Sequence, residues 1–232
     1  MKNYVIVGAI VIAIVIIVGY FLVAVQPKEA TRIENDWGDV KSQTNGALEN
    51  GTWGTRIYIE FEDGSEMPLY FVLQPTMSFE IGKNLGVYYS GKKVSKVYYV
   101  LEGRALGESE GMVDVRFNSF AIKTTAVSDG KILKTTTKPI GMINYQLPVN
   151  SEWVEIKRFS FSLSDLFGNY HLMSEYSGKI VKVTFEALGN ISYRVPGESG
   201  YHPASLPNPV TVDFKFTSPG HVEVSFRAGI KS

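Results

Sequence analysis

Residues 4–25, from Tyr4 to Val25, form an apolar segment without a single charged residue. As a helix, these 22 positions rise about 33 Å, enough to cross a hydrocarbon core of about 30 Å. The apolar residues cover every side of that helix, which is typical of a membrane span or of the centre of a large protein. A chain of 232 residues is too small for the second case. The segment therefore predicts a transmembrane anchor, residues 1–25 with the short N-terminal tail, that binds membrane lipid.

A cleaved signal peptide is the alternative interpretation of this segment. Signal peptides have a shorter apolar region, of about 7–15 residues, and a small-x-small exit, whereas this segment ends in LVAVQ. Cleavage after Ala24 fits that exit poorly, so we expect the anchor to be retained. Lys2 precedes the span, and Lys28 and Arg32 follow it. Positive charge on both sides means that the positive-inside rule barely decides the orientation of the helix in the membrane. A short tail before a long C-terminal part favours an extracytoplasmic C-terminal domain at the cell membrane.

After a polar tether, residues 26–36, apolar and polar residues alternate. A period of two is typical of strands with one buried face, as in antiparallel sheets packed on each other. The chain from residue 37 to 232 therefore predicts an all-β fold, an antiparallel β-sandwich that is immunoglobulin-like or related, as one large or two small sandwiches. The alternating segments are 57–61, 113–117, 154–163, 181–185, 212–216 and 222–226.

Short turn-forming sequences separate these segments and predict strands that recur about every eight to fifteen residues. Residues 103–107 (GRALG) are interpreted as a further turn, and residues 164–168 as a single helical turn. The expected hairpin pairs are Asp63-Gly64, Ser90-Gly91, Asp129-Gly130, Ser177-Gly178, Gly189-Asn190 and Pro219-Gly220.

Residues 196–209 (PGESGYHPASLPNP) form the longest irregular stretch, with four prolines and two glycines in fourteen residues. Proline blocks ladder hydrogen bonds and fixes its own φ, so a semi-rigid surface loop is expected. Long loops at the ends of a sandwich often carry binding residues, and the candidate contact residues here are Tyr201, His202, Pro203 and Pro207. A plain crossover between two sheets is the alternative.

Composition narrows the function classes. Lysine plus arginine and aspartate plus glutamate both number 23, so the chain has no basic excess for nucleic-acid binding. The chain has no cysteine, which excludes disulfides, thiolate catalysis, cysteine-ligated metal and a cysteine-linked lipid anchor.

Candidate catalytic residues are few. The three histidines, His171, His202 and His221, are accompanied by no Gly-x-Ser-x-Gly elbow, and the chain has no Gly-x-x-x-x-Gly-Lys loop for phosphate. The Ser-x-x-Lys spacings at residues 90–93 and 128–131 fall on expected hairpin turns rather than on one helical turn. We therefore expect no enzyme, with no catalytic residue and no cofactor.

The densest acidic group is EFEDGSE, residues 60–66. Clustered carboxylates such as Glu60, Glu62 and Asp63 could bind calcium, but alternation places them at a solvated hairpin tip, so no metal site is expected. Asn50 and Asn190 begin glycosylation sequons, which permit glycosylation without requiring it.

Two segments carry a family resemblance: residues 33–44 (IENDWGDVKSQT) and residues 97–109 (VYYVLEGRALGES). They resemble archaeal proteins of the late-embryogenesis-abundant type 2 class, also called the water-stress and hypersensitive-response domain. The resemblance implies an immunoglobulin-like or fibronectin-like sandwich behind a membrane helix, no catalysis, and a role in stress tolerance or envelope integrity. The chain departs from the family in lacking its Asn-Pro repeat after the first strand.

Three functional hypotheses follow. The first is a non-enzymatic, single-pass membrane protein of the cell envelope that acts through protein, glycan or envelope contacts. The second is a structural subunit that self-associates through exposed strand edges into a surface layer or filament. The third, a hydrolase built on the sandwich, requires Glu60, Glu62 and Asp63 to converge with a histidine in one pocket.

Overall fold

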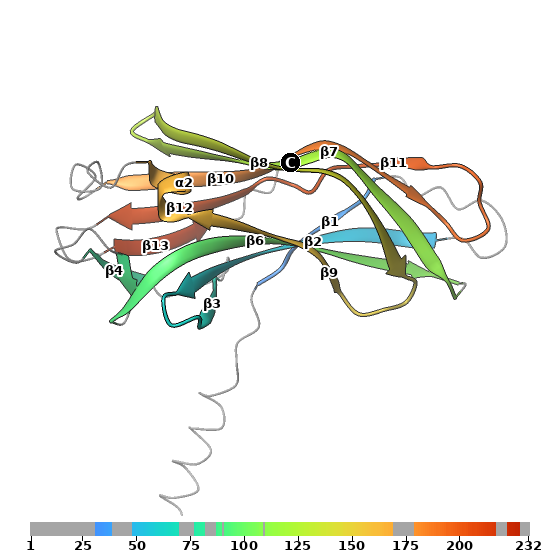
Figure 1. Cartoon of the computed structure of the whole chain (residues 1–232), viewed down its shortest axis with the longest axis horizontal. Helices are drawn as coiled ribbons and strands as arrows, with labels where there is room; N and C mark the ends of the chain where they lie inside the picture. The colour runs from blue at the N-terminus through green and yellow to red at the C-terminus, as the bar shows by residue number, and fades with distance from the viewer. Residues whose placement is uncertain are drawn as a thin grey trace, which may run out of the picture.

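The computed structural model of the chain describes residues 31–38, 48–69, 77–81, 87–89, 91–108, 110–168, 179–216 and 222–227. These residues form thirteen strands and one short helix (Figure 1). No helix within them is long and apolar enough to cross a membrane. The predicted anchor, residues 4–25, lies outside the described residues, as do His171 and His221.

The strands follow the chain in this order. They are β1 (Ile33–Asp36), β2 (Leu48–Phe61), β3 (Glu66–Leu69), β4 (Met77–Ile81), β5 (Val87–Tyr89), β6 (Lys92–Gly107), β7 (Met112–Ser128), β8 (Lys131–Pro148), β9 (Val154–Ser162), β10 (Ile180–Arg194), β11 (His202–Ala204), β12 (Val210–Phe216) and β13 (Val222–Arg227). The helix α2 (Leu163–Phe167) follows β9 directly.

The strands form two antiparallel sheets that share β6 (Figure 1). The first sheet contains β1, β2, β3, β6 and β9. The second runs from β5 through β4, β13, β12, β10 and β7 to β8, with β11 paired to one end of β10. The start of β6 pairs with β5, so the two sheets are continuous along one side. The predicted all-β, antiparallel fold of two sheets is confirmed.

Alternation places the apolar residues between the two sheets, as the sequence predicts. Ile57 and Ile59 of β2 are buried, and so are Val181 and Val183 of β10, while Lys182 between them is exposed. Buried residues from both sheets belong to one hydrophobic cluster. Burial of one face of each strand in a shared core is the main favourable contribution to such a fold.

Two expected turns are instead parts of long strands. Gly189-Asn190 forms a β-bulge inside β10, where the register with β7 shifts between Leu188 and Asn190. A Cβ on Gly189, whose φ is +107°, would lie 2.6 Å from the carbonyl oxygen of Ser119. Residues 103–107 lie within β6, where a Cβ on Gly103 would lie 2.8 Å from Ile156 Cδ1. Both glycines therefore serve close packing rather than chain reversal.

Other local predictions are confirmed. Asp129 and Gly130 have φ values of 50° and 74° and join β7 to β8 in a tight hairpin. The expected helical turn is α2, which begins with a capping box in which Ser162 and Asp165 exchange hydrogen bonds. Residues Ile33–Asp36, assigned above to the tether, form β1 at the edge of the first sheet.

Candidate functional site

The site begins with Trp37, which directly follows β1 and has only 1% of its surface exposed. Its backbone N–H donates to the Gly51 carbonyl over 2.8 Å, which holds the residue against β2. A Cβ on Gly51 would lie 2.1 Å from the nearest Trp37 ring atom. The indole therefore lies flat on β2 only because position 51 has no side chain.

Four rings lead from the core to the surface. The Trp37 ring lies 4.8 Å from the Trp53 ring and 5.3 Å from the Tyr193 ring, between centroids. Tyr193 in turn lies 5.5 Å from the ring of His202, whose side chain is 44% exposed. These separations and tilts are typical of favourable aromatic pairs. These contacts therefore hold the rings of Tyr193 and His202, at the outer end of the row, in fixed orientations.

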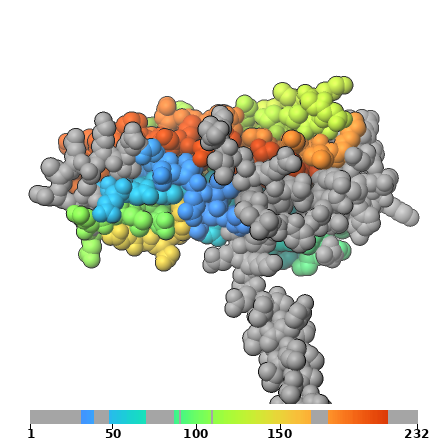
Figure 2. Space-filling view, turned by 180° about the vertical axis from the view of Figure 1, so that it is seen from behind, coloured from blue at the N-terminus to red at the C-terminus, as the bar shows by residue number. Residues whose placement is uncertain are grey.

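The segment after β11 ties the second sheet to the first. The Ser205 backbone N–H donates to the Trp37 carbonyl, and the Trp53 indole N–H donates to the Ser205 carbonyl over 2.9 Å. One step further, the Asn208 N–H donates to the Asn35 side chain over 3.3 Å. Figure 2 shows the result, with β1 (blue) between the cyan of β2 and the orange C-terminal strands. This closure positions β11 beside Trp37.

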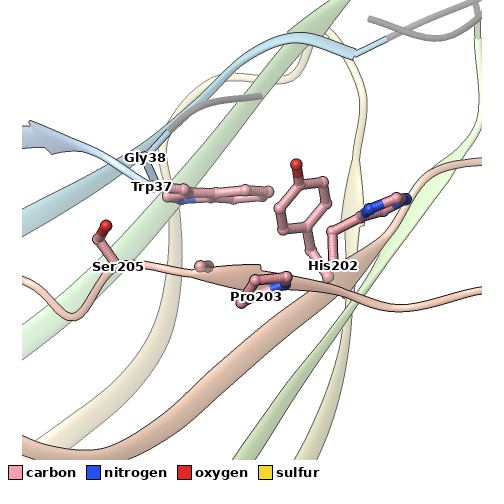
Figure 3. Close-up of a pocket in the computed structure, with 7 residues that line it drawn as sticks. Trp37, Gly38, His202, Pro203 and Ser205 are labelled. Carbon is pink, nitrogen blue, oxygen red and sulfur yellow. The ribbon is translucent and has the colours of Figure 1, made fainter. Parts of the chain in front are cut away.

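A pocket of about 420 Å³ opens at this closure (Figure 3). Figure 3 shows the Trp37 and Ser205 side chains toward one end of the pocket and His202 at the other, with Pro203 between them. Its volume lies within the range of small-molecule sites, about 300–1,000 Å³. The lining residues are Trp37, Gly38, Tyr193, His202, Pro203, Ala204 and Ser205.

Polar groups at the pocket are few and differ in character. The Trp37 indole nitrogen Nε1 is buried and has no hydrogen-bond partner among the residues that the structure describes. A buried donor without a partner costs about 1–3 kcal/mol. At the outer end, His202 Nε2 lies 2.6 Å from Glu198 Oε2. Burial, and then the negative charge of Glu198, raise the pKa of Tyr193, so its phenol stays protonated at neutral pH.

The four predicted contact residues are not equivalent. His202 and Pro203 line the pocket, whereas Pro207 is buried and is therefore no exposed contact residue. The guanidinium of Arg116 packs on the Tyr201 ring, 3.8 Å from the ring centroid, and the guanidinium of Arg194 lies 5.1 Å from the same centroid. The expected irregular loop also contains a strand, β11.

Sequence reasoning missed Trp37 and Tyr193 as pocket residues. Trp37 belonged only to the segment that carried the family resemblance, and Tyr193 is one alternating residue of β10 among many. The one local signal is the Trp37-Gly38 pair at the end of a polar segment. A large aromatic ring outside any alternating apolar segment indicates a separate packing site for that ring.

The acidic hairpin tip does not form a catalytic pocket with a described histidine. Its carboxylates lie beside lysines of β6, and the Lys92 ammonium, by its hydrogen bond, holds the pKa of Asp63 below its usual range. Within the described ranges, no group of three or more histidine, aspartate and glutamate side chains could bind a metal. The pairs are Glu60 with Lys96 at 3.3 Å, Glu62 with Lys93 at 2.5 Å, and Asp63 with Lys92 at 2.7 Å.

The outer face of the first sheet carries a second polar cluster. The Glu102 carboxylate accepts from Arg32 Nε at 2.7 Å and from Arg56 Nε at 2.9 Å. Its side chain is only 10% exposed, and burial raises its pKa. The guanidinium groups of Arg32 and Arg104 both pack on the ring of Trp153, at 4.3 Å and 4.9 Å from its centroid. Because Glu102 of β6 pairs with Arg32, which leads into β1, and with Arg56 of β2, we assign the cluster to the attachment of β1.

The two sequon asparagines lie in strands rather than in loops. Asn190 is exposed at the bulge of β10. Asn50 is half-buried in β2 and accepts a hydrogen bond from the Thr52 hydroxyl over 3.2 Å. Glycosylation stays a prediction for both, with the more accessible acceptor at Asn190.

Comparison of the chain with protein-family models, with curated proteins and with solved structures gave no significant match. The functional argument therefore depends on the pocket residues themselves.

Proposed function

We propose that the chain is a non-enzymatic binding module of the cell envelope, anchored to the membrane by residues 4–25, whose Trp37 pocket binds a sugar unit of an envelope glycan. The observation that carries this proposal is the Trp37 side chain, which lines the pocket and whose buried N–H has no partner among the described residues. Native proteins satisfy nearly all buried donors, so an unpaired donor on a ring that lines a cavity favours a ligand that brings an acceptor to it.

A sugar matches the rest of the lining. Pyranose rings combine apolar C–H faces with hydroxyl groups, and exposed aromatic rings such as His202 can stack on those faces. The Glu198 carboxylate and the Ser205 hydroxyl supply an acceptor and a donor near opposite ends of the pocket. A net charge of zero gives the chain no general preference for a charged ligand.

Hydrolysis is less well supported than binding. His202 has a carboxylate partner, Glu198, but a hydrolytic triad also needs a nucleophile within hydrogen-bond reach of the histidine. Ser205 is the serine of the pocket lining, and it lies at the end opposite His202 (Figure 3). No hydrogen bond joins the two among the described residues.

The anchor and the finer fold assignment belong to the same proposal. An uncharged segment of 22 residues supports a membrane span, and β1 begins at Ile33, so only residues 26–32 connect the two. Seven extended residues reach at most about 25 Å, which would hold the domain close to the bilayer. Two antiparallel sheets are compatible with an immunoglobulin-like sandwich, and the resemblance to water-stress proteins supports a role in envelope stress tolerance.

The test uses the full chain in detergent micelles, titrated with a panel of hexoses, aminosugars and their oligomers by isothermal calorimetry. For a sugar that binds, Trp37→Phe keeps most of the ring and removes the N–H, so the Kd should rise about tenfold for one lost hydrogen bond. The matched control is Trp153→Phe on the outer face of the first sheet, which should leave the Kd unchanged. Equal affinities of both variants, or no binding by any sugar, would overturn the proposal.

A further inference from the structure

Trp153 lies on the outer face of the first sheet, in the segment that leads into β9, and forms the Trp153 cluster with Arg32 and Arg104, which pack on its ring. A Cβ on Gly54 of β2 would lie 2.6 Å from Arg32 Cδ and 2.9 Å from Trp153 Cζ3. Both side chains therefore lie against the β2 backbone only because position 54 has no side chain. Trp153 and Arg104 are half-buried, so each is also accessible from outside.

Arg104 carries the charge of this cluster that no carboxylate neutralises. Arg32 pairs with Glu102 at 2.7 Å and lies 3.9 Å from Glu34. Arg104 forms no ion pair with any residue that the structure describes, and its Nε is buried without a hydrogen-bond partner among them. A guanidinium that packs on an aromatic ring is held in one plane, and its planar N–H groups match the oxygens of a phosphate. Arg104 is therefore suited to bind an anionic group from outside the protein.

The tether ends at this cluster. Only residues 26–32 separate the proposed anchor from β1, and Arg32 is the last of them. Seven residues reach at most about 25 Å, so Arg32 stays near the membrane surface. The outer face of the second sheet is farther from this point, because two packed sheets lie about 10 Å apart. The short tether therefore favours contact of the bilayer with the outer face of the first sheet.

We propose that the Trp153 cluster docks on the headgroup layer of the bilayer that holds the anchor, with Arg104 on a lipid phosphate and the Trp153 ring at headgroup level. The inference rests on the membrane anchor of the proposed function. Tryptophan is enriched at membrane–water interfaces because its ring combines an apolar body with a polar N–H. The docked face shares no residue with the lining of the Trp37 pocket, so docking and sugar binding are compatible.

The three tryptophans report on docking without any introduced label site. The full chain with fluorinated tryptophan is placed in nanodiscs of phosphatidylcholine and phosphatidylglycerol that contain a lipid with a gadolinium chelate on its headgroup. Gadolinium broadens the ¹⁹F resonances of nearby fluorine atoms. Trp37 and Trp53 are 1% and 0% exposed in the core, behind the outer face of the first sheet. The Trp153 resonance should therefore broaden most.

Arg104→Gln tests the phosphate contact. One basic residue near an anionic leaflet is worth about a fivefold change in an equilibrium, so the docked-to-undocked ratio, taken from the broadening at Trp153, should fall about fivefold. The matched control is Arg116→Gln, because the Arg116 guanidinium also packs on an aromatic ring, that of Tyr201, but on the outer face of the second sheet. It should leave the ratio unchanged. An unshifted Trp37 resonance shows that each variant is folded.

Equal broadening of the three resonances, or an equal effect of the two variants, would overturn the proposal. Broadening of Trp153 by a soluble gadolinium chelate alone would show a face turned to solvent, and broadening by neither chelate a face covered by protein; both would also overturn it. A chain that separates from the nanodiscs in size-exclusion chromatography contradicts the anchor and the docking together. A chain that stays with them but does not dock contradicts the docking alone, and sugar binding by that chain would leave the proposed function standing.

Discussion

The substitution Gly51→Ala tests how the Trp37 ring is held. The added Cβ would lie 2.1 Å from the ring, whereas carbon atoms in contact lie about 3.5–4.0 Å apart. The ring would have to move by about 1.5 Å, away from β2 and into Trp53 and Tyr193, which pack against it. If the ring is displaced from its site, the loss is comparable to truncating a buried aromatic residue, about 3–5 kcal/mol. That is a large part of a typical unfolding free energy of about 5–15 kcal/mol.

The assay is denaturant unfolding of the full chain in micelles, followed by tryptophan fluorescence. Gly200→Ala is the matched control, because a Cβ there meets no atom within 4 Å, and its unfolding free energy should change by less than about 0.5 kcal/mol. In a Trp37→Ala background the ring is gone, so Gly51→Ala should cost less than about 1 kcal/mol. A cost below about 1 kcal/mol in the wild-type background, or the same cost in both, would refute this account of Gly51.

Three further predictions concern stability. Glu102→Gln removes the charge that Arg32 and Arg56 share, but burial raises the pKa of this carboxyl and offsets part of the gain from pairing, so the unfolding free energy should fall by only about 1 kcal/mol in the same denaturation assay, and no loss would contradict the pairing. Ser162→Ala removes the cap of α2 and should cost about 1 kcal/mol by the denaturation midpoint, whereas an unchanged midpoint would contradict the capping role. The hydrogen bond from the Tyr98 hydroxyl lowers the pKa of Glu60, so the ionised Glu60 carboxylate stabilises the fold. That stabilisation is present above the ordinary carboxyl pKa of about 4 and is lost as the pH falls through the lowered pKa. Tyr98→Phe should therefore flatten the plot of unfolding free energy against pH in this range, and an unaltered plot would contradict the assignment.

The strands could be predicted because the alternation that defines them is a property of near neighbours in the sequence. The same holds for the Asp129-Gly130 hairpin and for α2, which depend on residues a few positions apart. Gly189 was assigned to a turn because its role depends on the carbonyl of Ser119, which lies on another strand. Local patterns do not contain that contact.

The pocket could be predicted only at one of its walls. The proline-rich composition of residues 196–209 pointed to His202 and Pro203, which line the pocket. Trp37 comes from the other end of the chain, and it meets β11 because β1 borders the first sheet while β11 borders the second. The order of the strands in the sheets brings Trp37 next to β11, and that order cannot be read from local patterns in a single sequence.

The claim that the Trp37 pocket is the ligand site is tested most directly by ¹⁹F NMR of the full chain with fluorinated tryptophan. The chain has three tryptophans, so substitution of each by phenylalanine assigns three resonances. Titration with a sugar identified by calorimetry should shift the Trp37 resonance in proportion to the bound fraction and leave the Trp153 resonance in place. A shift of the Trp153 resonance alone, or saturating binding without a shift at Trp37, would contradict the claim.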